Sequence, residues 1–289
     1  MFPKRFPIVI LAFALALALA IGAALAVHRP EAVEGDAGGF DVMTFNVGDA
    51  NPRPFPVART AACILEEGRP DILFLQEAPG GRARAELLET LGYPYAARAQ
   101  AGSGKLAGLA VLSVYPIGET REIELPSEGK GAGALCAVLD MGGEKVLACS
   151  VHLDEVDPKV RNSEGEVVFS ARQALDAMYA ELFSDTVRTA AVRALGAAVA
   201  DAGMPVILAG DFNTVPVSRT IRHLTARYRD VLWPEVGWFQ GTYHKIAFPL
   251  NPRIDYIFVS PRIAVDQARV LPRSAGDHFP VRARLGKKT

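Results

Sequence analysis

Short apolar stretches alternate with amphipathic ones along most of the chain and predict a layered mixture of strands and helices. Continuous apolar runs such as Asp71–Gln76 and Pro205–Ala209 are typical of strands buried on both faces. Apolar residues at helical spacing predict helices at Val57–Glu67 and Val187–Ala202. Further strands are predicted at 41–47, 109–114, 253–260 and 263–271, and further helices at 82–91 and 170–183.

Strands outnumber helices in this prediction, and hairpins mix with strand–helix–strand units. No break in composition divides the chain after residue 40. We therefore expect an α/β (α+β) fold in which two packed mixed β-sheets are covered by helices. A single domain is predicted from about residue 40 to residue 286.

One predicted hairpin can be placed residue by residue. The strands Leu135–Met141 and Glu144–His152 are joined by a Gly-Gly pair, a typical two-residue hairpin signal. This register places Cys136 opposite Cys149 in a non-hydrogen-bonded pair, where strands lie closest. We expect two buried free thiols there, and a cross-strand disulfide is the alternative in an oxidising compartment.

The first 30 residues differ from everything that follows. Two basic residues precede the unbroken apolar run 6–27, which is long enough to span a bilayer as a helix. Ala24-Leu25-Ala26 resembles the cleavage site of a secretory signal. We expect residues 1–30 to be a signal sequence or a membrane anchor and residues 31–39 to be a linker. Either interpretation places the remaining chain outside the cytoplasm, as a secreted, periplasmic or outward-facing anchored protein.

Charge and cysteine content narrow the function classes. The 289 residues include 31 basic and 32 acidic ones, without a long run of one sign. This balance argues against a dedicated nucleic-acid or anionic-membrane surface, although a local groove can still be basic. Three cysteines form neither a metal cluster nor a disulfide framework. Four arginines at 219, 222, 227 and 229 could form a basic patch, but a solvated helix face is the simpler interpretation.

Polar residues follow or interrupt the predicted strands in six segments, where α/β proteins hold their sites. These residues are Asn46, Glu77, His152, Asp211, Asn213, Asp255, Asp277 and His278. Each has an ordinary structural explanation when it is read alone, such as a turn or a satisfied core histidine. The pair Asp211 and Asn213 is the most informative, because two residues apart in an extended segment their side chains converge on one point.

Asp255 and the Asp277-His278 pair complete the candidate chemistry. A charged residue in the apolar strand 253–260 needs a partner, and Asp255 could accept a hydrogen bond from His278. An Asp–His pair directed at a water molecule is a general-base arrangement. The carboxylates of Asp277 and Glu77 are ligands that hard cations such as Mg²⁺ prefer.

Taken in order, the six segments resemble the endonuclease/exonuclease/phosphatase superfamily, which has the fold of pancreatic deoxyribonuclease. The matching stretches run from Thr44 to Val281 and read TFNV, LQE, SVHL, GDFN, RIDYIFVS and DHFPV. The resemblance implies a four-layer αββα sandwich with its site at one end of the paired sheets. It also implies Mg²⁺ (or Mn²⁺) bound mainly by Glu77, with Asn46 and Asp277 nearby.

The same resemblance implies a role for each remaining residue. Asp211 would orient or deprotonate the attacking water, and Asn213 would contact the phosphoryl group. His278, hydrogen-bonded to Asp255, would be a base or a charge stabiliser. His152 would act on the phosphate or on the leaving group.

Two positions depart from the family pattern. Gly48 stands where several members have an aspartate, and Gly276 stands where a serine is usual. Both departures affect the fine geometry of the metal site, so we still expect activity.

We expect a divalent-metal-dependent phosphoesterase that hydrolyses a phosphodiester by in-line water attack. The substrate would be a phospholipid or a nucleic acid, with membrane contact through residues 6–27 if they are retained, and no protein partner is evident. The alternatives are a secreted or anchored endonuclease and a catalytically silent binding module. Specificity is expected in Glu155–Thr186, either a lid or a surface excursion, and in Trp233–Asn251, whose aromatic residues could contact a base, a lipid or the sandwich.

Overall fold

The computed structural model describes most of the chain after residue 38. The predicted signal or anchor and residues 31–38 of the linker lie outside the described residues. Within the described part, no helix combines the length and the apolar character needed to cross a bilayer. The described residues are 39–48, 55–100, 104–129, 131–155, 159–161, 167–233, 240–245 and 251–287.

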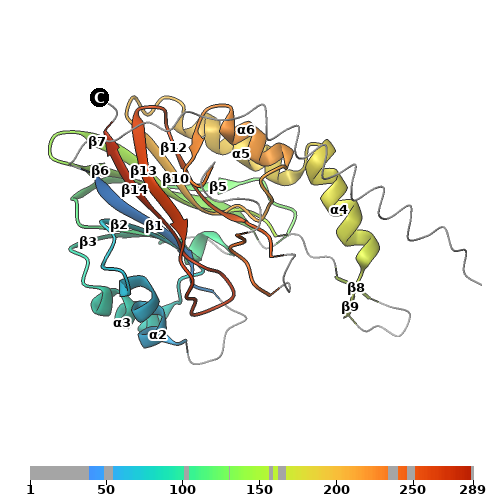
Figure 1. Cartoon of the computed structure of the whole chain (residues 1–289), viewed down its shortest axis with the longest axis horizontal. Coiled ribbons are helices and arrows are strands. Elements are labelled where there is room, and N and C mark those ends of the chain that lie inside the picture. Colours follow the sequence, from blue (N-terminus) through green and yellow to red (C-terminus); the bar gives the residue numbers. More distant parts are fainter. Residues whose placement is uncertain are drawn as a thin grey trace, which may run out of the picture. The chain divides into compact units, whose positions relative to one another are not determined.

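Two six-stranded mixed sheets form the centre of the domain (Figure 1). The first sheet runs in the order β13 (Ile263–Val270), β14 (Val281–Lys287), β1 (Phe40–Asn46), β2 (Ile72–Gln76), β4 (Ala110–Ser113) and β3 (Tyr95–Arg98). The second runs in the order β11 (Arg229–Asp230), β12 (Asp255–Val259), β10 (Val206–Asp211), β7 (Lys145–His152), β6 (Ala132–Asp140) and β5 (Ile117–Leu125). The parallel pairs β1–β2 and β7–β10 lie at the centres of the two sheets.

Alternation along the central strands gives each sheet two apolar faces. In β1, Val42 packs in the core between the sheets, while Met43 and Phe45 belong to an outer cluster. In β10, Ile207 lies between the sheets and Leu208 lies in the opposite outer cluster. Two sheets with apolar outer faces must be covered on both sides, which is the reason for a four-layer arrangement.

Helices supply the two outer layers (Figure 1). The first sheet is covered by α2 (Val57–Leu65) and α3 (Gly81–Leu91), and the second by α5 (Val187–Val199) and α6 (Arg219–Thr225). The predicted four-layer αββα sandwich with two packed mixed sheets is thereby confirmed. A further helix, α4 (Ala171–Phe183), follows a two-stranded sheet of β8 (Lys159–Arg161) and β9 (Val167–Phe169).

The predicted elements are present with ends that differ by a few residues, but some strands were not predicted. The strand β5 is an edge strand with a mostly exposed, charged sequence, so it lacks a clear apolar alternation. In β14 the side chain of Arg282 is buried, and its Nη1 donates to the carbonyls of Glu67 and Gly68 at 3.1 and 2.8 Å. A buried arginine that is satisfied by backbone carbonyls cannot be distinguished from an exposed one in a sequence pattern.

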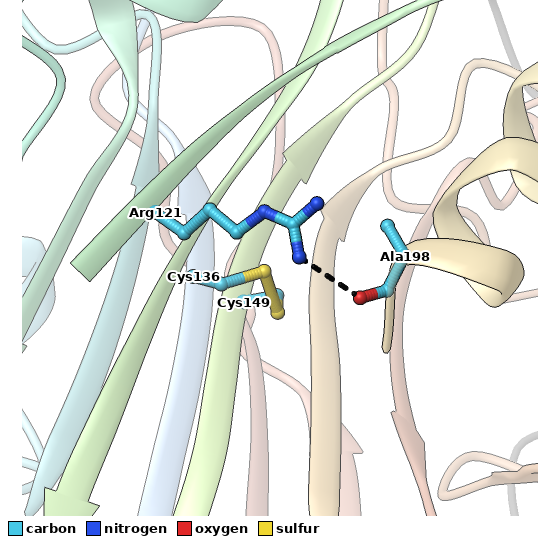
Figure 2. Close-up of a disulfide and its surroundings, with 4 residues drawn as sticks. All are labelled: Arg121, Cys136, Cys149 and Ala198. Atoms are coloured by element: carbon cyan, nitrogen blue, oxygen red, sulfur yellow. Dashed lines mark hydrogen bonds between the residues drawn. A yellow bond between two sulfur atoms is a disulfide. The ribbon is translucent and has the colours of Figure 1, made fainter. Parts of the chain in front are cut away.

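The hairpin β6–β7 has the predicted register, with Cys136 opposite Cys149. The expectation of two free thiols is wrong, because the structure joins them in a disulfide with an S–S distance of 2.09 Å (Figure 2). The physical reason is the pairing itself, which brings the two Cα atoms to 3.9 Å with both side chains buried on one face. Beside this disulfide, Arg121 of β5 donates to the carbonyl of Ala198 at 3.3 Å. The third cysteine, Cys63, is free and buried.

Candidate active site

The ends of four central strands bring the predicted site residues together. Asn46 ends β1 and His152 ends β7. Asp211 ends β10, where it pairs with His152 on one side and with Asp255 of β12 on the other. The parallel strands of each sheet therefore deliver their polar residues to one edge of the sandwich.

A buried polar contact joins the two sheets directly beneath this edge. The Nε2 of Gln76 donates to Ser150 Oγ at 2.9 Å, and this hydroxyl donates to the carbonyl of Leu75 at 2.9 Å. Thr44 Oγ1 donates to Gln76 Oε1 at 3.2 Å. All three side chains are fully buried. This link fixes the spacing between the strand that precedes Glu77 and the strand that carries His152.

Asp211 lies at the centre of the site and is almost fully buried. Its Oδ1 accepts from the backbone N–H of Asn213 at 2.8 Å, and its Oδ2 accepts from Asn46 Nδ2 at 3.1 Å. The Nε2 atoms of His152 and His278 lie 3.4 and 3.8 Å from the same Oδ2. Burial alone would raise the pKa of Asp211, but the His152 hydrogen bond and the charge of His278 hold this pKa well below its usual range.

His278 and Asp255 form the predicted pair. The Nδ1 of His278 donates to Asp255 Oδ2 at 2.8 Å, and the ring of Tyr243 packs edge-on against the imidazole at 5.0 Å between centroids. Thr242 Oγ1 accepts from the backbone N–H of Asp255 at 3.0 Å. Burial lowers the pKa of His278, but the Asp255 carboxylate outweighs it, with help from Asp211, and raises this pKa to about 9. At neutral pH, therefore, His278 is an imidazolium.

Glu77 approaches the site in an unusual backbone conformation. Its φ is 53°, its side chain is 42% exposed, and its Oε1 lies 3.3 Å from Asn46 Nδ2 and 3.8 Å from His152 Nε2. A Cβ added to Gly48 would lie only 1.9 Å from Glu77 Oε2. The glycine that departs from the family pattern therefore leaves the space that the Glu77 carboxylate occupies.

Asn46 is placed at the site, but its amide is turned away from the role predicted for it. The Nδ2 donates to Glu77 and Asp211, while the Oδ1 accepts from the backbone N–H of Gly48 at 2.9 Å. A metal would need this oxygen, so Asn46 in this orientation positions the two carboxylates instead.

Asn213 and Asp277 lie at the rim of the same site. Asn213 also has a positive φ, 50°, and its Nδ2 donates to the carbonyl of Leu153 at 2.9 Å. The predicted phosphoryl contact of Asn213 would require this amide to leave Leu153. Asp277 Oδ1 lies 3.9 Å from His278 Nε2, and its Oδ2 forms an ion pair with Lys245 Nζ at 2.7 Å.

One side chain of the site, Lys105, was not predicted from the sequence. Its Nζ lies 2.7 Å from His152 Nε2, and the residue is only 8% exposed. The following turn is held against Glu77, because Ala78 N donates to Gly108 O at 2.9 Å and a Cβ on Gly108 would lie 2.8 Å from Glu77 Cα. A lysine in a glycine-containing loop usually faces solvent, so the sequence contains no signal that separates Lys105 from a surface residue.

The donor atoms fit a hard divalent cation. Glu77, Asp211 and Asp277 offer carboxylate oxygens, the ligands that Mg²⁺ prefers, and the Glu77 carboxylate is partly open to solvent. Atoms of Asp211, Asp255 and His278 also lie within 4.8 Å of one another. This second group could also hold a metal ion, and the direct hydrogen bond between Asp255 and His278 suits the same residues to proton and charge positioning.

The sandwich and this carboxylate–histidine centre define a hydrolase fold of the phosphoesterase and nuclease type. Residues 43–278 match the family model of the Endonuclease/Exonuclease/phosphatase family, and the chain belongs to that family. Its members are hydrolases that act on phosphoester bonds. A search of curated proteins found no match.

Solved structures of the family superpose on most of the chain. The endonuclease/exonuclease/phosphatase from Beutenbergia cavernae DSM 12333 is 25% identical over 86% of this chain and 72% of its own, with a TM-score of 0.61. SmcL is 16% identical over 86% and 99% of the two chains, with a TM-score of 0.64. D. rerio TDP2, complexed with a single-strand DNA product, is 18% identical over 86% and 100%, with a TM-score of 0.62. The last two likenesses concern the fold alone.

Proposed function

We propose that this chain is a divalent-metal-dependent phosphodiesterase that acts outside the cytoplasm by in-line attack of water. The observation that supports this best is the buried Asp211 carboxylate, which two imidazoles approach at 3.4 and 3.8 Å. Glu77 faces the same histidine, His152, from the other sheet at 3.8 Å. A buried carboxylate, two imidazole rings and a carboxylate that is partly exposed to solvent are the groups that phosphodiester hydrolysis needs.

Each side chain of the centre has a step to perform. Asp211 holds and orients the attacking water, whose proton passes to bulk water as the new P–O bond forms. The imidazolium of His278 faces the negative charge that develops on the phosphoryl oxygens. Lys105 Nζ lies 2.7 Å from His152 Nε2, and this pair donates a proton to the leaving oxygen as its bond to phosphorus breaks.

A divalent cation held by Glu77, with Asp211 or Asp277, would supply Lewis-acid stabilisation of the phosphoryl oxygens. Gly48 supports this assignment, because only glycine leaves room for the Glu77 carboxylate beside Asn46.

Two features support a location outside the cytoplasm. The apolar run 6–27 is typical of a signal or anchor. The Cys136–Cys149 disulfide is of a kind that forms and persists in oxidising compartments.

The arginines after Asn213 weigh against the nuclease alternative. Arg219 Nε pairs with Asp185 at 3.0 Å, and Arg222 Nη2 donates to the carbonyl of Leu182 at 2.7 Å. Guanidinium groups held in this way are poor contacts for several phosphates of a nucleic acid. This supports a phospholipid as the substrate.

The test is Mg²⁺-dependent hydrolysis by the full chain of three substrates: bis(p-nitrophenyl) phosphate, phosphatidylcholine vesicles and plasmid DNA. We expect Asp211→Asn to lower the rate by about 10³-fold or more. The matched control is Asp201→Asn, which changes an exposed aspartate and should leave the rate unchanged. Folded protein that hydrolyses none of the three with either Mg²⁺ or Mn²⁺ would refute the proposal.

A further inference from the structure

Large apolar side chains are concentrated on the exposed surface of one helix, α4. Among the described residues, the only large hydrophobic side chain that is exposed outside this helix is Tyr95, at 39%. On α4 the exposed fractions are 60% for Leu175, 44% for Met178, 62% for Tyr179 and 58% for Phe183.

These four residues form a single stripe, which we call the α4 stripe. Met178 and Tyr179 lie three and four residues after Leu175, and Phe183 lies four residues after Tyr179, so the four residues share one side of the helix. The rings of Tyr179 and Phe183 contact each other with their centroids 4.9 Å apart. A contiguous apolar surface of this kind typically marks an interaction site, whereas scattered apolar residues do not.

The inner side of α4 carries a buried carboxylate, Glu181, which holds the helix to the body. Glu181 is 4% exposed and forms an ion pair with the buried Arg188 of α5 at 2.7 Å. Hydroxyl groups of Thr214 and Thr220 also donate to Glu181, at 2.7 and 3.3 Å. Glu181 thus anchors α4 to the body, while the α4 stripe lies on the exposed surface together with the ion pair of Arg172 and Asp176.

The same contacts tie α4 to the active site. Thr214 directly follows Asn213, and Arg188 Nη1 donates to the carbonyl of Asp154, two residues after His152. In Figure 1, α4 projects from the layer of α5 and α6 and lies beside β8 and β9. A partner bound to the α4 stripe would therefore be held at a fixed position relative to both loops.

We propose that the α4 stripe docks on the surface of a lipid bilayer and presents phospholipid headgroups to the active site. The choice of a phospholipid as substrate rests on the proposed function, whereas the docking surface does not. The sequence supplies the reason for choosing a bilayer. Residues 6–27 are apolar enough to anchor in a membrane, and residues 28–38 could span at most about 40 Å between this anchor and β1.

A tether of this length keeps the domain at high effective concentration beside the bilayer, so a small apolar surface is sufficient for docking. Tyr179 adds the kind of side chain that favours the headgroup region, where an aromatic ring can be apolar at one end and hydrated at the other. The balanced net charge agrees with docking through apolar contact instead of attraction to anionic lipids.

The docking surface can be tested without any turnover. Full-length Tyr179→Cys, labelled with an environment-sensitive fluorophore, is mixed with excess phosphatidylcholine vesicles that carry a spin-labelled quencher in their acyl chains. Labelled Glu119→Cys, at an exposed position of β5, is the control. Native thiols do not interfere, because Cys63 is buried and the other two form the disulfide.

We expect quenching at position 179 and none at position 119. An unquenched label at 179 on vesicle-bound protein, or on protein that fails to bind vesicles, overturns the proposal. A spectral shift at 179 that depends on protein concentration without lipid overturns it too, because the stripe would then bind a second copy.

Activity provides an independent measure. The double variant Tyr179→Ser/Phe183→Ser should hydrolyse phosphatidylcholine vesicles at least about tenfold more slowly while retaining its rate on soluble bis(p-nitrophenyl) phosphate. Tyr95→Ser removes an exposed aromatic ring from β3 and should change neither rate. An equal loss on both substrates contradicts a docking role.

The two measurements separate the two proposals. A quenched label on a protein that hydrolyses neither substrate would retain the docking surface and reject the phosphodiesterase. Turnover of the soluble diester by a protein whose label is not quenched would retain the phosphodiesterase and reject the docking surface.

Discussion

The charge state of His278 is the most consequential property of a single residue in the site. A folded-state pKa of about 9 lies above the value of about 6.5 for an unfolded histidine. The pair with Asp255 therefore stabilises the fold fully below pH 6.5, and this contribution is lost as the pH rises through 9.

The difference between the two pKa values corresponds to a stabilisation on the order of 3 kcal/mol. Urea unfolding in EDTA at pH 6 and pH 9.5 should show this loss in the wild type but not in His278→Gln. Equal pH dependence in both proteins would mean that another group is responsible.

Gly48 makes a second residue-level prediction. In Gly48→Ala the new methyl group would displace the Glu77 carboxylate, because the added Cβ lies 1.9 Å from Glu77 Oε2. We expect the Mg²⁺ concentration for half-maximal activity to rise by about tenfold, a change typical of disturbed ligand positioning. In the control Gly118→Ala the new Cβ has only ordinary contact, 3.7 Å from Val138 O, and the Mg²⁺ requirement should not change.

At this scale the sequence predicted which residues meet but not how their atoms are oriented. The Asp255–His278 pair follows from one rule, that a charge inside an apolar strand needs a partner. The amide direction of Asn46 depends on the backbone N–H of Gly48, and the burial of Lys105 depends on a turn packed against Glu77. Both are tertiary contacts that residue order does not contain.

Helix α4 carries the prediction at the scale of elements. Glu181→Ala leaves the Arg188 guanidinium buried without its carboxylate, which typically costs about 3–5 kcal/mol of unfolding free energy. Asp176→Ala on the same helix breaks only the exposed ion pair with Arg172 and should have little effect. Chemical denaturation of both variants distinguishes them, and similar midpoints would show that the Glu181 contact contributes little.

Elements were predictable where burial and periodicity agree. Helix α4 was predicted from its spacing and begins after Ser170, whose side chain accepts from Gln173 N. The exposure of its apolar stripe was not predictable, because the pattern gives the period of the apolar residues and not the side that faces the protein. Edge strand β5 was missed because exposed polar and charged residues occupy most of it and interrupt the apolar alternation.

The disulfide makes a prediction for the molecule as a whole. It joins two cysteines 13 residues apart, so its removal should lower the unfolding free energy by about 3 kcal/mol on the chain-entropy account. Unfolding with and without a strong reductant measures this difference. Reductant should have no effect on Cys136→Ala/Cys149→Ala, and a wild type that is equally insensitive would show that its thiols are free in solution.

The order of strands in the first sheet has a consequence for synthesis of the protein. Among the described strands, β1, the first, lies between β2 and β14, the last, and His278 lies three residues before the start of β14. A nascent chain that has emerged only as far as β12 contains Asp255 and Asp211 but lacks their histidine. The candidate site is therefore completed only when the segment just before β14 has been made, and truncated or stalled products would lack the activity that we propose.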